Sequence, residues 1–261
     1  MFSYSRMDKI MPKIPDIAIE ATSTIAGAGA AYQVGDPSAG YAVSEFLNKG
    51  LRGLLNHFSS QRQSKRIIDV TTFALNEIRR RLEDGETLRD DGFFDKTIDR
   101  SDAEEVFEAV LLKVRDEPEE KKIPYMGSLF ANACFDHGLD SGLLHFLCKE
   151  FESLTYRQLC IIKVIIENKY PLSFKSVVER TFPEDPIPQL SVETSIECVN
   201  LRHRGYVDFE QSPLDDPRSG AVALLVPGTM RCTVPAVQMY GRMGLSSIPE
   251  SDVHPIGKAL S

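Results

Sequence analysis

The chain has 261 residues, of which 42% are hydrophobic and 26% charged, a composition typical of an ordinary folded protein with one or two domains. No run of 18 or more strongly apolar residues occurs, which argues against an ordinary membrane-spanning helix. The five cysteines are scattered and include no CxxC pair, so we expect a reducing compartment rather than a disulfide framework.

The net charge of −8 is unevenly distributed along the chain. Residues 1–66 carry eight basic and five acidic groups, residues 67–152 carry 11 and 21, and residues 153–261 carry 11 and 12. The acidic middle part would repel nucleic acid, so only residues 1–66 could favour an anionic partner or membrane face. Residues 1–15 lack the apolar region of a secretory signal, which predicts a cytoplasmic protein. Peripheral contact with the inner membrane stays open.

Residues 21–34 are uncharged and small, with Gly27 and Gly29 at their centre. The helix predicted after them has an apolar face made of Val43, Leu47, Leu51, Leu54 and Phe58. Small residues let two helix backbones approach closely, as in assemblies and membranes. The candidate contacts for assembly or for a membrane are Gly27, Gly29, Leu47 and Leu54. The alternative is a soluble helix pair docked on the rest of the chain, or a loose end, and the shortness of the uncharged run favours this alternative.

A basic segment, residues 59–66, follows this N-terminal part. It contains Arg62, Lys65 and Arg66, and it is either a link between two helices or the solvated middle of one long helix. The three cations could meet anionic headgroups or an acidic partner. The helical pattern then continues to Gly85, the expected C-cap.

The acidic middle part, residues 67–152, predicts a bundle of helices. Ser101 and Glu104 have the spacing of a capping box at a helix start. That helix should end before Pro118, and a second should begin near Pro124. The apolar positions of these helices and of two further ones are Val106, Phe107, Val110, Leu111, Val114, Leu129, Phe130, Ala133, Leu144, Leu147, Phe151, Leu159 and Ile162.

Four residues in this part form the pattern C-x2-H-x7-H-x2-C, namely Cys134, His137, His145 and Cys148. Such a set could hold a tetrahedral zinc ion. The spacing is not that of a recognised zinc finger, however, and both cysteines fit the apolar faces of their helices, so we expect core packing and no metal. No G-x-S-x-G, H-E-x-x-H or glycine-rich phosphate loop is present. We therefore predict no catalytic residues, no cofactor and no enzymatic activity.

From Leu154 onward the pattern is one of helices followed by a hairpin. The predicted helices are 155–168, 174–182 and 190–203, the predicted strands are 205–210 and 220–226, and a further helix is 233–244. This order resembles a winged helix, so residues 153–248 are predicted to form a winged-helix-like domain. Residues 249–261 are polar and are predicted to be a surface tail.

A winged helix suggests DNA binding, for which Arg202 and Arg204 would be the candidate contacts. The same helix carries Glu193 and Glu197, and the predicted hairpin carries four more carboxylates. Because groove binding needs Lys and Arg to meet phosphates, we favour a structural or protein-binding use of the fold and expect no nucleic-acid partner.

One further pattern spans residues 65–165. Its parts are an acidic helix, a charged turn, an apolar helix and the start of the next helix, found here as Glu104-Glu105, Lys121-Lys122, Leu129-Phe130-Ala131 and Leu154-Thr155 to Gln158. This layout resembles the bacterial phage-resistance proteins of the Abi-alpha type. The resemblance implies a role in phage defence by abortive infection, and it supplies no catalytic residues.

The expected fold is therefore mainly α, with a helical bundle core followed by a winged-helix-like domain with a small β-hairpin. We expect a non-enzymatic bacterial defence or protein-interaction protein that acts through its N-terminal segment. Its protein partners are unknown, and formation of a homo-oligomer stays open. The alternative is a winged-helix transcriptional regulator that binds DNA. A metal-dependent hydrolase ranks third, because no acid–base constellation is present.

Overall fold

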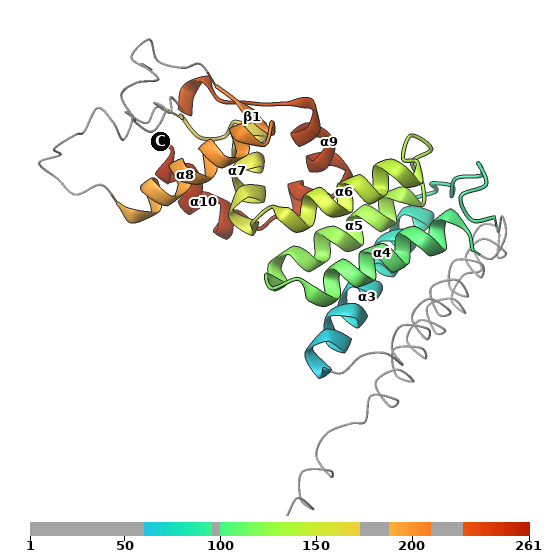
Figure 1. Cartoon of the computed structure of the whole chain (residues 1–261). Helices are drawn as coiled ribbons and strands as arrows, with labels where there is room; N and C mark the ends of the chain where they lie inside the picture. The colour runs from blue at the N-terminus through green and yellow to red at the C-terminus, as the bar shows by residue number, and fades with distance from the viewer. Residues whose placement is uncertain (1–59, 96–99, 173–187, 210–226) are drawn as a thin grey trace, which may run out of the picture. The chain divides into compact units, whose positions relative to one another are not determined.

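The computed structural model describes residues 60–95, 100–172, 188–209 and 227–261, and this part of the chain is mainly helical (Figure 1). The chain divides into two compact units, Met1–Glu152 and Ser153–Ser261. Residues 21–34, the helix predicted after them, the candidate helix 174–182 and the candidate strand 220–226 lie outside the described residues. In the described ranges, no helix is both long enough and apolar enough to cross a membrane.

Within residues 60–95 and 100–152, the first unit contains four α-helices and one short 3-10 helix. They are α3 (Gln61–Glu83), α4 (Asp102–Asp116), η2 (Glu120–Lys122), α5 (Ile123–Ala133) and α6 (Ser141–Ser153). α3 packs on both α4 and α5 (Figure 1). Gly127 of α5 lies so close to α3 that an added Cβ would be 2.8 Å from the Phe73 ring and 3.2 Å from the Val70 carbonyl oxygen. Only glycine permits this approach.

The predicted start of α4 is confirmed in atomic detail. The Ser101 side chain accepts a hydrogen bond from the Glu104 N–H, and the Glu104 carboxylate accepts one from the Ser101 N–H. The helix ends at Asp116, two residues before Pro118. Its apolar positions are buried: Val106, Phe107, Val110, Leu111 and Val114. α5 then begins with Pro124 in its first turn, close to the start that the sequence predicts.

The start of α3 corrects the predicted boundary between residues 66 and 67. Ser60 is the N-cap, so residues 61–66 form the first turns of α3 rather than a link between helices or the middle of a longer helix. Arg66 is buried instead of solvated. At the other end the C-cap is Asp84 rather than the predicted Gly85, which follows it with φ +88°, a left-handed conformation that suits the residue after a helix end.

The second unit contains α7 (Tyr156–Glu167), α8 (Gln189–His203), α9 (Val234–Arg242) and α10 (Glu250–Ala259). α7 is central, since it packs on α8, α9 and α10. Its start is a second capping box, formed by Thr155 and Gln158. Two short strands, β1 (Val207–Asp208) and β2 (Arg231–Cys232), pair antiparallel, with Val207 opposite Cys232.

β1 falls inside the predicted strand 205–210, but its partner differs from the sequence prediction. The described residues that pair with it are Arg231 and Cys232, which precede Thr233, the N-cap of α9, whereas the predicted partner 220–226 lies outside the described residues. The helix expected at 233–244 is confirmed as α9.

The prediction of a surface tail at residues 249–261 is wrong. Ten of these residues form α10, which packs against α7 and α8. Its buried face consists of Val253, Ile256, Gly257, Ala259 and Leu260. Gly257 contacts the ring of Tyr170 so closely that an added Cβ would lie 2.6 Å from it. The last helix is therefore part of the core of the second unit.

Candidate functional site

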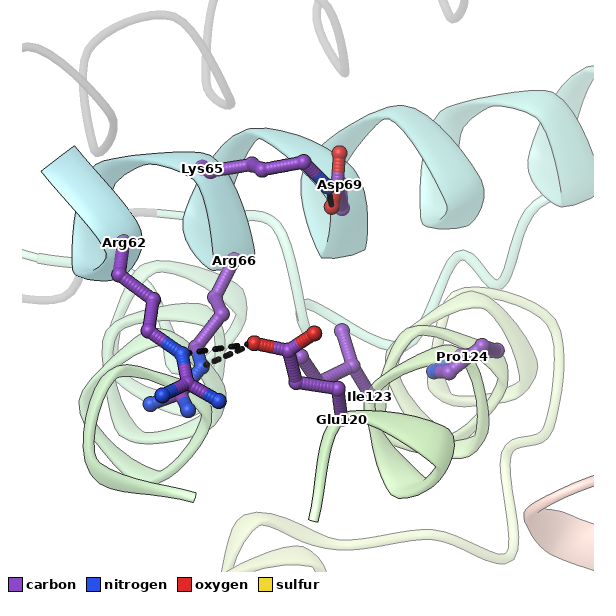
Figure 2. A pocket seen from close by; sticks show the side chains of 7 residues that line it. All are labelled: Arg62, Lys65, Arg66, Asp69, Glu120, Ile123 and Pro124. Carbon is purple, nitrogen blue, oxygen red and sulfur yellow. Dashed lines mark hydrogen bonds and ion pairs between the residues drawn. The ribbon is translucent and has the colours of Figure 1, made fainter. Parts of the chain in front are cut away.

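A basic pocket lies at the start of α3, over the turn that joins α4 to α5 (Figure 2). Its volume is about 220 Å³. The lining residues, which we call the α3 basic pocket, are Arg62, Lys65, Arg66, Asp69, Glu120, Ile123 and Pro124. The three cations are those that the sequence grouped as a candidate contact for an anion.

Two arginines of this pocket converge on one carboxylate oxygen. Arg62 Nε donates a hydrogen bond of 2.8 Å to Glu120 Oε1, and Arg66 Nε lies 3.6 Å from the same oxygen (Figure 2). The hydrogen bond from Arg62 is the main cause of a lowered pKa at Glu120. The arrangement shows that the pair of guanidinium groups is spaced to share a single anionic group between them.

Lys65 belongs to a separate ion pair on the rim. Its Nζ is 2.5 Å from Asp69 Oδ2, one helical turn along α3. The hydrogen bond with Asp69 raises the pKa of Lys65. Both side chains are largely exposed, and exposed pairs of this kind contribute only about 0–1 kcal/mol to stability. Lys65 can therefore turn toward another anion at little cost.

Arg66 differs from the other two cations because it is buried and fixed. Its side chain is 10% exposed, against 66% for Arg62, and Arg66 Nη1 donates to the Arg115 carbonyl oxygen at 3.1 Å. Arg66 Nε, by contrast, is buried and makes no hydrogen bond. A buried donor without a hydrogen-bond partner costs roughly 1–3 kcal/mol, so this nitrogen is an unused donor beside the pocket.

Searches of protein-family models, curated proteins and solved structures find no match to this chain. The α3 basic pocket therefore has to be interpreted from its own chemistry.

The candidate zinc ligands do not come together. His137 Nε2 lies 3.1 Å from Asp90 Oδ1, and His145 Nε2 lies 3.2 Å from Glu105 Oε1, so each imidazole has a carboxylate neighbour. Cys134 and Cys148 are buried in the apolar core. Within the described ranges, no group of three or more His, Cys, Asp or Glu side chains is arranged to hold a metal ion.

The five thiols give a direct test of this packing. Burial raises the pKa of Cys134 well above its ordinary value, and it raises the pKa of Cys148, Cys198 and Cys232 to about 12. Because the thiolate is the reactive form, the native chain at pH 8 should react with an aromatic disulfide reagent far more slowly than a free cysteine does. Cys232 should react first, since it alone of the five is not fully buried.

The labelling experiment compares native and unfolded protein. All five thiols should react rapidly in guanidinium chloride, and Cys232→Ser should remove the fastest native phase. A second thiol that reacts at the rate of free cysteine before unfolding would contradict the described packing.

The two candidate DNA contacts are engaged within the second unit. Arg204 Nη1 donates to the Ser153 carbonyl oxygen at 2.7 Å. The Arg202 guanidinium lies 4.4 Å from the centre of the Phe209 ring and is 24% exposed. Both arginines therefore already contact residues of the second unit, and a phosphate would have to compete with these contacts.

The acidic side chains of α8 accept hydrogen bonds from the neighbouring helix α7. Arg157 Nη1 donates to Glu193 Oε2 at 2.6 Å, and Gln158 Nε2 donates to Glu197 Oε2 at 2.7 Å. Both donors belong to α7, so these carboxylates help to hold α8 on α7. The candidate assembly contacts Gly27, Gly29, Leu47 and Leu54 lie outside the described residues.

Sequence reasoning missed Glu120 as a member of the site. It lies 58 residues from Arg62 along the chain, and only the packing of α3 over η2 brings the two together. The charged run Glu119-Glu120-Lys121-Lys122 was the available signal, because it predicts an exposed turn that can offer a carboxylate.

Proposed function

We propose that this chain is a non-enzymatic interaction protein of bacterial phage defence. In this proposal the first unit binds an anionic partner at the α3 basic pocket, and the N-terminal segment that precedes α3, residues 1–59, acts in assembly or at a membrane. The observation that carries the proposal is the meeting of Arg62, Lys65 and Arg66 in one pocket at the start of α3.

The distribution of charge supports this role. Residues 67–152 have a net charge of −10, so the pocket is a local basic site on an acidic unit. A basic site of this kind favours a small anionic group that fits within the pocket. A long nucleic acid would extend over the acidic surface around the pocket and be repelled there. The resemblance to Abi-alpha proteins, which covers residues 65–165, implies abortive infection as the process.

We propose the winged-helix arrangement for the second unit, with a structural or protein-binding role. The observation that favours it is the order of α7, α8 and the antiparallel pair β1–β2. A DNA-binding regulator is the second candidate function. It is the weaker candidate because Glu193 and Glu197 accompany Arg202 and Arg204 on or beside α8, and the two arginines have partners within the unit.

The role of the N-terminal segment is tested in bacterial cells challenged with phage. The full chain should reduce plaque numbers or arrest the growth of infected cells. Gly27→Leu combined with Gly29→Leu should abolish this effect, because larger side chains prevent close approach of helix backbones. A chain that starts at Ser60 should also be inactive, yet it should remain soluble and helical by circular dichroism.

Two results would contradict this assignment. If the double leucine variant protects cells as well as the original chain does, close packing of residues 21–34 is not needed. If the chain from Ser60 aggregates, the N-terminal segment is part of the core rather than an effector.

A further inference from the structure

We propose that the α3 basic pocket binds a phosphate group, and that the Glu120 carboxylate competes with this group for Arg62 and Arg66. This inference rests on the proposed function, since it names the chemistry of the anion that the same site would take. Three features of the described residues carry it: the fixed position of Arg66, the convergence of two arginines, and the mobility that exposure allows at Glu120.

Arg66 is a cation that is held in place before any ligand arrives. Its side chain is 10% exposed, and its Nη1 is anchored to the Arg115 carbonyl oxygen. Its Nε is buried without a hydrogen bond at the edge of the pocket. A ligand oxygen that reached this nitrogen would satisfy a buried donor, and the preorganised guanidinium would lose little freedom on binding.

Glu120 occupies the position that an anionic ligand would take between the arginines. Its oxygen Oε1 is 2.8 Å from Arg62 Nε and 3.6 Å from Arg66 Nε, so the contact with Arg66 is too long for a hydrogen bond (Figure 2). The Glu120 side chain is 55% exposed and lies on the three-residue helix η2. It can therefore swing into solvent and release both arginines.

Phosphate suits the released site better than a second carboxylate does. Arg62, Arg66 and Lys65 approach from α3, and a phosphate group offers enough acceptor oxygens to reach all three, whereas a carboxylate offers two. To displace Glu120, a ligand also has to exceed an intramolecular carboxylate in charge or in the number of hydrogen bonds. Ile123 and Pro124 form an apolar wall, against which the rest of a phosphorylated molecule can lie.

The test is a calorimetric titration of the full chain with inorganic phosphate in a phosphate-free buffer of low ionic strength. Glu120→Gln should tighten binding about two- to fivefold, because it removes an exposed competing ion pair. Arg66→Gln should weaken binding at least about tenfold, because a charged hydrogen-bond donor is lost. Arg62→Gln, at an exposed position, should also weaken binding, and it serves if Arg66→Gln fails to fold.

Matched controls separate the pocket from general charge effects. Arg80→Gln removes an exposed arginine from the far end of α3, and Glu105→Gln removes an exposed carboxylate from α4. Both variants should bind phosphate as the original chain does. Equal binding by the original chain and the Arg62→Gln and Arg66→Gln variants would overturn the inference, as would the absence of binding to both phosphate and anionic lipid.

A second arm distinguishes the source of the phosphate. Sedimentation with phosphatidylcholine vesicles, with and without phosphatidic acid, whose phosphate is a monoester, tests a lipid headgroup under the same conditions. Binding only to vesicles with phosphatidic acid, lost in Arg62→Gln, assigns the site to lipid, whereas binding to free phosphate alone assigns it to a phosphorylated small molecule. If neither ligand binds but defence in cells still needs Arg62, the phosphate inference fails while the proposed function stands.

Discussion

Replacing Lys122 with alanine is expected to lower the free energy of unfolding of the first unit by about 3–5 kcal/mol, because it leaves the Glu117 carboxylate buried without its counter-charge. Lys122 is 1% exposed and Glu117 is 6% exposed. Lys122 Nζ lies 2.7 Å from Glu117 Oε2 and also donates to the Glu152 carbonyl oxygen at 3.2 Å. The lysine therefore joins the turn after α4 to the end of α6. Chemical denaturation followed by circular dichroism measures the loss.

A double variant provides the control for this prediction. Lys122→Met combined with Glu117→Gln removes both charges while it keeps similar side-chain volumes. The glutamine can still accept the hydrogen bond that Glu117 Oε1 receives from the Glu119 N–H. This variant should be clearly more stable than Lys122→Ala, since a neutral pair leaves no unpaired buried charge. If the two variants are equally destabilised, the unpaired buried charge does not explain the loss, and the hydrogen bond from Lys122 to the Glu152 carbonyl oxygen, which both variants lack, does.

Replacing Phe107 with alanine is expected to cost the first unit about 3–5 kcal/mol of stability. Phe107 on α4 is 1% exposed, and its ring centre is 4.7 Å from that of Phe130 on α5, which is 0% exposed. Truncation removes this contact and leaves a cavity between the two helices. The midpoint of denaturant unfolding should fall without a large change in the denaturant dependence.

Phe146 on α6 is the matched control for this truncation. Its side chain is 52% exposed, so Phe146→Ala should change stability by no more than about 0.5 kcal/mol. A large loss for Phe146→Ala with a small loss for Phe107→Ala would mean that the core of the first unit is elsewhere.

The helix starts could be predicted because their signals are local. Ser101 with Glu104, and Thr155 with Gln158, satisfy the first backbone N–H groups of α4 and α7 from within four residues. α10 was missed because residues 249–261 look polar on average. Its apolar residues nevertheless recur at helical spacing, at Val253, Ile256, Gly257 and Leu260, and that pattern was the available signal.

The candidate site could be predicted only in part. The grouping of Arg62, Lys65 and Arg66 follows from their helical spacing, which places them near one another on α3. The burial of Arg66 and the position of Glu120 beside the arginines depend on how α3 packs over the turn before α5. No short sequence pattern predicts that packing, because the contacting residues lie far apart along the chain. The sequence therefore predicts a basic site but neither its depth nor its internal carboxylate.

The most direct test of the α3 basic pocket as the functional site is a phage challenge of cells that express Arg62→Gln combined with Arg66→Gln. Arg80→Gln on the same helix is the control, and thermal unfolding of each purified variant shows that it is folded. The account predicts that the double variant loses protection against phage while Arg80→Gln keeps it. Full protection by a folded double variant would contradict it.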